Sequence, residues 1–168
     1  MKRLIFLFIG IVLFLLINTA RLHAQITQSE LNQVELMKQF KGTWKAEIGK
    51  DSIIIWECES FGDALEFTIK SEISGIKTID GKSLIGYDRK NDRLIEAVIL
   101  KNSPIITLCP SWFNTTNSFE QIMWEDISNP EKAKWKWVIK FKSDDLMELI
   151  ETRNNEITFI RTFHRERK

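Results

Sequence analysis

Polar and apolar residues alternate through most of this sequence, most clearly between residues 134 and 142. One parity carries large apolar side chains, namely Trp135, Trp137, Ile139 and Phe141. The other parity carries four lysines around Val138. Successive side chains of a β-strand point to opposite faces of its sheet, so this period of two predicts a strand with one buried face and one solvated face.

The same alternation recurs in short segments from Gly42 to His164, and residues typical of turns separate neighbouring segments, as at Asn154-Asn155. No second helical pattern interrupts them. Roughly eight to ten short strands in this arrangement predict an all-β, antiparallel up-and-down meander, either closed as a barrel or folded as a sandwich. We favour the β-barrel.

The spacing of apolar residues is different just before the first expected strand. Four of them recur every three positions, namely Leu31, Val34, Met37 and Phe40. This spacing predicts a short amphipathic helix from Gln28 to Gln39, with Ser29 as a candidate N-cap. We expect the helix to plug or flank one end of the barrel.

The N-terminus has the layout of a secretory signal peptide. A basic start precedes an apolar run of 14 residues, Leu4 to Ile17. This run is shorter than the roughly 20 residues of a helix that spans a bilayer, so we predict cleavage, after Ala24 or after Ala20. The prediction is a signal peptide at residues 1–24 and a single domain at residues 25–168. The domain would be periplasmic or extracellular, with no membrane span after cleavage.

Net charge gives no reason to expect a nucleic-acid partner. The whole chain has 24 basic and 23 acidic side chains, and removal of residues 1–24 leaves a net charge of −2. Single-stranded nucleic acid binds to basic grooves that also carry aromatic side chains. The lysines and tryptophans of residues 134–142 point to opposite faces and do not form such a groove.

The two cysteines, Cys58 and Cys109, have two interpretations. In an oxidising compartment they can pair, and a disulfide that closes so long a loop stabilises a fold by about 4 kcal/mol. Alternatively, both are buried free thiols that pack as small apolar side chains. The sequence leaves both interpretations open.

No motif for catalysis, metal binding or a cofactor occurs. The sequence has no nucleophile elbow, no phosphate-binding loop and no Cys/His spacing typical of zinc. His164 is the only histidine after residue 24, and it belongs to a charged C-terminal segment, which favours a solvated side chain. We therefore expect neither an enzyme nor a metal or cofactor site.

The chain resembles the calycin superfamily, in particular secreted lipocalin-like proteins of bacteria. Phe40-Lys41-Gly42-Thr43-Trp44 is similar to the glycine-x-tryptophan signature that opens lipocalin barrels, and it follows the expected helix. Gly86-Tyr87-Asp88 before a turn and a last strand that bears Arg161 are also similar. The likeness covers nearly all of residues 25–168 and implies a barrel that holds a small ligand.

The resemblance also implies that Trp44 packs at the closed end of the barrel beneath an arginine of the last strand. Arg161 and Arg165 are the candidates, and we favour Arg161. A second interpretation of Arg161 is that it points into the barrel and binds an anion there. That anion would be a ligand carboxylate or an internal glutamate. Three glutamates are candidates for it: Glu57, Glu96 and Glu148.

Aromatic side chains offer further ligand contacts, because indole and phenyl faces pack on apolar molecules. Trp112 and Phe113 follow Pro110 near an expected barrel mouth, whereas Trp135 and Trp137 either touch a ligand or fill the core. The sequence thus predicts an exported barrel that binds a small apolar or amphipathic ligand. The alternative is a filled barrel that serves as an interaction module for another envelope protein or a surface polymer.

Overall fold

A computed structural model describes residues 31–167 of the protein. Its strands are β1 (Gly42–Gly49), β2 (Ser52–Phe61), β3 (Ala64–Ile73), β4 (Ile76–Asp88), β5 (Arg93–Leu100), β6 (Ile106–Thr115), β7 (Ser118–Ile122), β8 (Trp135–Ser143), β9 (Leu146–Arg153) and β10 (Glu156–Arg165). The helical elements are α2 (Gln33–Met37), η1 (Lys38–Phe40), η2 (Trp124–Asp126) and η3 (Pro130–Lys132). These elements belong to one compact unit that begins at Gln33. Within residues 31–167, no helix is long and apolar enough to cross a membrane.

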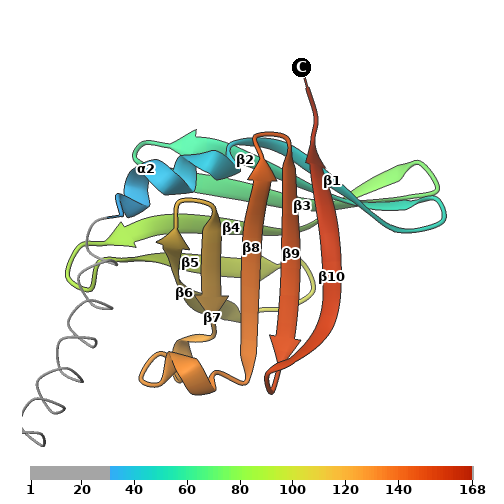
Figure 1. The fold of residues 1–168 in the computed structure, drawn as a ribbon. Coiled ribbons are helices and arrows are strands. Elements are labelled where there is room, and N and C mark those ends of the chain that lie inside the picture. Colours follow the sequence, from blue (N-terminus) through green and yellow to red (C-terminus); the bar gives the residue numbers. More distant parts are fainter. Residues whose placement is uncertain (1–30, 168) are drawn as a thin grey trace, which may run out of the picture. The chain divides into compact units, whose positions relative to one another are not determined.

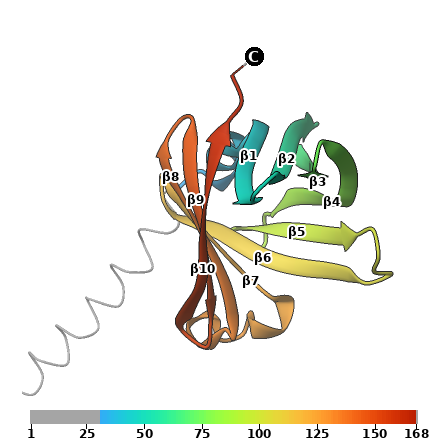
Figure 2. The ribbon, with the colours of Figure 1, turned by 90° about the vertical axis from the view of Figure 1, so that its right-hand side faces the viewer.

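The ten strands form a closed antiparallel barrel in which each strand pairs with its neighbours in sequence and β10 returns to pair with β1. This confirms the predicted all-β up-and-down barrel preceded by a short helix. Strands β7 to β10 stand across the direction of β2 to β5 (Figure 1), and β5 and β6 run across β8 to β10 in the second view (Figure 2). Side chains from these crossed faces fill the interior between them.

Strand β8 shows why the alternating sequence folds in this way. Ile139 and Phe141 are buried inside the barrel, whereas Lys140 and Lys142 are exposed. The β9–β10 turn also follows the prediction, because Asn154 and Asn155 adopt φ angles of 52° and 66°. Asparagine tolerates this left-handed region, which tight two-residue hairpin turns require.

The N-terminal helix is shorter than predicted. Residues 31 and 32 are not helical, and α2 begins at Gln33. The Gln33 side chain is buried and bonds both backbone groups of Phe113: its Nε2 donates to the carbonyl oxygen at 3.0 Å, and its Oε1 accepts from the amide at 2.7 Å. These bonds anchor the first turn of α2 against β6. Gln28, Ser29 and the expected signal peptide lie outside the described residues.

The end of the barrel that η1 covers, hereafter the closed end, is filled with aromatic rings. The Phe40 ring makes edge-on contacts with three phenylalanine rings from different strands, at centroid distances of 5.0 to 5.7 Å. Those three rings are Phe67, Phe119 and Phe141. The predicted role of this N-terminal segment as a plug is therefore confirmed.

Trp44 lies where the barrel closes, and the arginine stacked on it is Arg165. The Arg165 guanidinium carbon is 4.4 Å from the centroid of the fully buried indole. The register explains why Arg161 does not take this place: β1 meets β10 only at the pairs Trp44–Arg165 and Lys45–His164. Arg161 lies four residues away along β10, beyond the paired stretch, so the favoured Trp44–Arg161 pair is corrected to Trp44–Arg165.

The residues around this pair explain the glycine-x-tryptophan motif. Gly42 adopts a φ of 118°, which side chains with a Cβ rarely tolerate, and it lies directly against the Arg165 side chain. The Trp44 Nε1 donates to the Phe40 carbonyl oxygen at 2.8 Å, and an Arg165 NH2 group donates to the Gln39 carbonyl oxygen at 2.8 Å. Both partners of the stacked pair thus hold η1 at the closed end.

We expect Arg165→Ala to lower the free energy of unfolding by about 1–3 kcal/mol, because it removes the stacking and a backbone hydrogen bond. Trp44→Ala should cost more, about 3–5 kcal/mol, as the deletion of a large core side chain. A double-mutant cycle followed by urea denaturation should show strong coupling between the two. Arg161→Ala is the matched control, and coupling of Trp44 to Arg161 instead would contradict this assignment.

Candidate functional site

A cavity of about 180 Å³ lies inside the barrel. Most of its wall is apolar, formed by Phe40, Trp56, Phe67, Ile69, Ile85, Val98, Phe119, Trp137, Ile139 and Leu149. Three polar side chains line it among the described residues: Ser83, Glu96 and Gln121. Small-molecule sites typically combine such an apolar wall with a few polar groups that orient the ligand. This cavity is the candidate functional site.

The three polar side chains converge from different strands. Ser83 belongs to β4, Glu96 to β5 and Gln121 to β7, and all three occupy inward positions. Strand β6 lies between β5 and β7, and it carries small side chains there: Cys109 faces Glu96 and Ser111 faces Gln121. The small β6 residues leave room for Gln121 to reach across to Glu96.

Each oxygen of the Glu96 carboxyl group accepts one hydrogen bond. The Ser83 hydroxyl donates to Oε1 at 2.5 Å, and the Gln121 Nε2 donates to Oε2. No lysine, arginine or histidine is among the described residues that line the cavity. No described lysine, arginine or histidine elsewhere forms an ion pair with Glu96. Glu96 is therefore an internal acid whose hydrogen-bonding partners are neutral.

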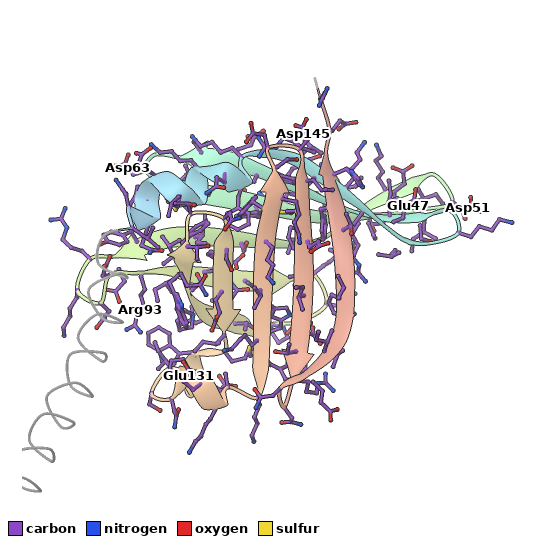
Figure 3. The ribbon with its side chains drawn as sticks, in the orientation of Figure 1. Glu47, Asp51, Asp63, Arg93, Glu131 and Asp145 are labelled. Atoms are coloured by element: carbon purple, nitrogen blue, oxygen red, sulfur yellow. The ribbon has the colours of Figure 1, made fainter. Side chains whose placement is uncertain are left out.

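Glu96 lies inside the barrel, at the cavity wall. Two of the charged residues labelled in Figure 3, Asp51 and Asp145, lie instead at turns between strands. Burial raises the pKa of Glu96, because the charged form loses its water shell inside the barrel. The hydrogen bonds from Ser83 and Gln121 favour the carboxylate and offset part of that rise in pKa. Desolvation is the larger effect, so the pKa of Glu96 lies above its ordinary value.

Cys58 and Cys109 are both free and buried, so the structure has two unpaired thiols in place of the disulfide considered above. They belong to β2 and β6, which are separated in the sheet by β3, β4 and β5. Burial raises the pKa of each thiol to about 12, and the nearby Glu96 adds to the rise. Both sulfurs are therefore protonated at neutral pH and are weak nucleophiles.

Two of the predicted aromatic ligand contacts lie at or beside the cavity. Trp137 lines it, and its Nε1 donates to the Glu151 Oε2 at 3.0 Å. Trp135 packs edge-on against Trp137 with ring centroids 5.7 Å apart, and the Arg153 guanidinium stacks on Trp135 at 4.3 Å. These contacts hold the Trp137 indole in place at the cavity wall.

The other two predicted aromatic contacts do not line the cavity. Phe113 is fully buried at the closed end, where its ring centroid lies 5.2 Å from that of Phe119. Trp112 immediately precedes Phe113 on β6, so its side chain points to the opposite, outer face, where it pairs across the sheet with Glu120. Phe113 is thus a core residue, and Trp112 lies on the outside of the barrel.

Arg161 does not line the cavity, although it pairs across the sheet with Leu149, which does. Its guanidinium stacks on Phe159 at 5.0 Å, and the residue lines a groove between β1 and β10 together with Lys45 and His164. Two of its three suggested glutamate partners are ion-paired elsewhere: Glu57 with Lys70 at 2.6 Å, and Glu148 with Lys142 at 2.8 Å. The third, Glu96, is internal, but it is bonded to Ser83 and Gln121.

Ser83 and Gln121 were not among the site residues predicted from the sequence. The alternation of the sequence could have indicated them, because Ser83 shares a strand face with Ile85, and Gln121 shares one with Phe119. A polar residue on an inward parity marks a buried hydrogen-bonding group. Parity alone does not show that Ser83 and Gln121 meet at one carboxyl group.

We expect Glu96→Gln to remove a pH-dependent loss of stability. Because its pKa is raised above the ordinary 4.5, the native state keeps a proton that the unfolded state releases. Wild-type stability is then fully present below pH 4.5 and falls as the pH rises to the native pKa, by about 1.4 kcal/mol per pH unit in that window. Urea denaturation from pH 4 to about pH 8 measures the difference. Parallel stability curves for the two proteins would contradict this prediction.

The architecture is compatible with a lipocalin-like barrel: ten antiparallel strands close on themselves, and a short helix precedes the first strand. The arginine-capped tryptophan of β1 adds to this likeness. Neither a known protein-family model nor any curated protein sequence matches this chain.

Proposed function

We propose that the protein is an exported, lipocalin-like carrier or sensor that binds a small, mostly apolar ligand inside its barrel. The observation that carries the proposal is the cavity of about 180 Å³ with one internal acid at its wall. An apolar cavity of about 150 Å³ in another protein stays dry and binds benzene. The cavity of this barrel is therefore large enough for a ligand of about one ring.

The size of the cavity also limits the class of ligand. Pockets for drug-sized molecules have volumes of about 300–1,000 Å³, and this one is smaller. The rings at the closed end, including Phe40 and Phe119, occupy the space that a long acyl chain would need. We therefore expect a single-ring or short-chain molecule with one polar group.

The internal surface provides both affinity and orientation for such a molecule. Removal of the ligand's apolar surface from water contributes about 25 cal/mol per Å². Trp56, Phe67 and Trp137 offer ring faces to the ligand, and Glu96 offers a hydrogen-bonding group at a fixed place. The polar group of the ligand would then point toward β5.

The proposed export and family rest on other residues. The basic start and apolar run up to Ile17 support a cleaved signal peptide and a periplasmic or extracellular location. Gly42, Trp44 and Arg165 at the barrel closure support the likeness to calycins.

One surface observation favours the second candidate function, an interaction module for an envelope protein or a surface polymer. The β3–β4 hairpin exposes Ile73, Ile76 and Ile79, whose exposed fractions are 56%, 70% and 50%. Ile73 and Ile76 are cross-strand partners at the tip of the hairpin. Exposed apolar groups that lie together often mark contacts with a partner.

Thermal denaturation with toluene and indole as probes tests the carrier proposal. Probe at about 100 times its Kd should add about 2.7 kcal/mol of stability and raise the Tm. Val98→Phe places a ring in the cavity and should abolish the shift, whereas Ile99→Phe adds the same ring at the next, outward position of β5 and should preserve it. A shift that survives in the Val98→Phe variant would contradict binding in the barrel, and no shift with any probe would favour the interaction module.

A further inference from the structure

The described residues of the cavity wall include an acidic side chain and no basic side chain. Among the described residues that line the cavity, Glu96 is the only one with an ionisable side chain. Glu96 also acts on two buried thiols, those of Cys58 on β2 and Cys109 on β6, whose pKa values it helps to raise. Burial raises the pKa of each thiol to about 12, so both remain neutral and supply no charge.

The hydrogen bonds around Glu96 favour its ionised form without neutralising it. Ser83 donates to one carboxyl oxygen and Gln121 to the other, so each oxygen keeps further acceptor capacity. Neutral donors orient a carboxylate, but the cost of burying its charge remains until a cation approaches. Glu96 faces the cavity, so a cation can approach it from the ligand side.

The aromatic wall favours the same class of ligand. Trp56 and Trp137 line the cavity together with Phe40, Phe67 and Phe119. The faces of aromatic rings carry partial negative charge and attract ammonium groups, most strongly in the case of tryptophan. An anionic ligand would find a carboxyl group and ring faces here, because no described residue of the wall has a cationic side chain. Arg161 pairs across the sheet with the wall residue Leu149, but its guanidinium stacks on Phe159.

We propose that the cavity binds a small organic cation, a protonated amine that carries one ring or a short alkyl group, and that its ammonium pairs with the Glu96 carboxylate. This inference rests on the proposed function and names the class of ligand. The sequence had suggested that Arg161 binds the carboxylate of a ligand. In the present proposal Glu96 binds the ammonium group of a ligand instead.

Protons balance when such a ligand binds. If the empty cavity holds protonated Glu96, entry of an ammonium ion releases that proton to the solvent. Entry of the neutral amine instead moves the proton from Glu96 to the amine nitrogen, and the same ion pair results. Affinity for the amine should therefore increase with pH as Glu96 ionises, and decrease again above the pKa of an alkylamine, about 10.

Isothermal titration calorimetry with three probes of similar size tests the inference: 2-phenylethylamine, 2-phenylethanol and 3-phenylpropionate. The wild-type protein should bind the amine about tenfold to a hundredfold more tightly than the alcohol, because a charge-assisted hydrogen bond replaces a neutral one. The carboxylate should bind most weakly. Repetition from pH 4 to about pH 8, in buffers with different ionisation enthalpies, should show proton release with the amine over the range in which Glu96 of the free protein is still partly protonated, and none with the alcohol.

Two variants make the test specific to Glu96. Glu96→Gln keeps the size of the side chain and should remove the preference for the amine while the alcohol still binds. Glu120→Gln is the matched control, because Glu120 lies next to Gln121 on β7 but pairs with Lys136 at 2.9 Å, away from the cavity. The control variant should keep the preference of the wild-type protein.

The outcomes separate this inference from the proposed function. If none of the three probes binds the wild-type protein, both the ligand-binding function and the amine inference are wrong. If the alcohol or the carboxylate binds as tightly as the amine, only the amine inference is overturned. Proton release is measured on the wild-type protein, so its absence at every pH from 4 to about 8 overturns the inference even if Glu96→Gln fails to fold.

Discussion

The stacked pair of Arg165 and Trp44 lies where the sheet becomes a barrel. Strands β1 and β10 share only two residue pairs, and this is one of them. The same two side chains bond the carbonyl groups of Phe40 and Gln39, which fixes η1 across the closed end. Phe40 in turn forms part of the cavity wall. Sheet closure, the helical plug and the wall of the candidate site are therefore linked through one cation–π contact.

Much of the fold was predictable because alternation is a local property of the sequence. The lysine and tryptophan pattern of β8 specifies which side chains face inward, and Asn154-Asn155 specifies a tight turn. Local sequence did not determine which arginine, Arg161 or Arg165, stacks on Trp44. That choice depends on where β10 meets β1, and that register is set by packing between residues more than 100 positions apart. The sequence resemblance named both arginines, and only the register distinguishes them.

The site was less predictable for a similar reason. Parity places Glu96 inside, but its contact with Gln121 depends on the small Cys109 and Ser111 side chains of the strand between them. Phe113 was expected near a mouth, whereas the position of α2 makes its part of β6 the closed end. The volume of a cavity follows from how all inward side chains pack together. Composition and spacing do not specify such a quantity.

The short β1–β10 ladder has a consequence for motion. Strands β2 and β3 share ten residue pairs, whereas β1 and β10 share two. Among residues 31–167, no strand pairs with this edge of β1 beyond Lys45 or with the facing edge of β10 before His164. Local opening costs least where the fewest hydrogen bonds and packed side chains must separate. We therefore expect the barrel to open first at this seam, and for the ligand that we propose, the rate of that opening would limit how fast it leaves.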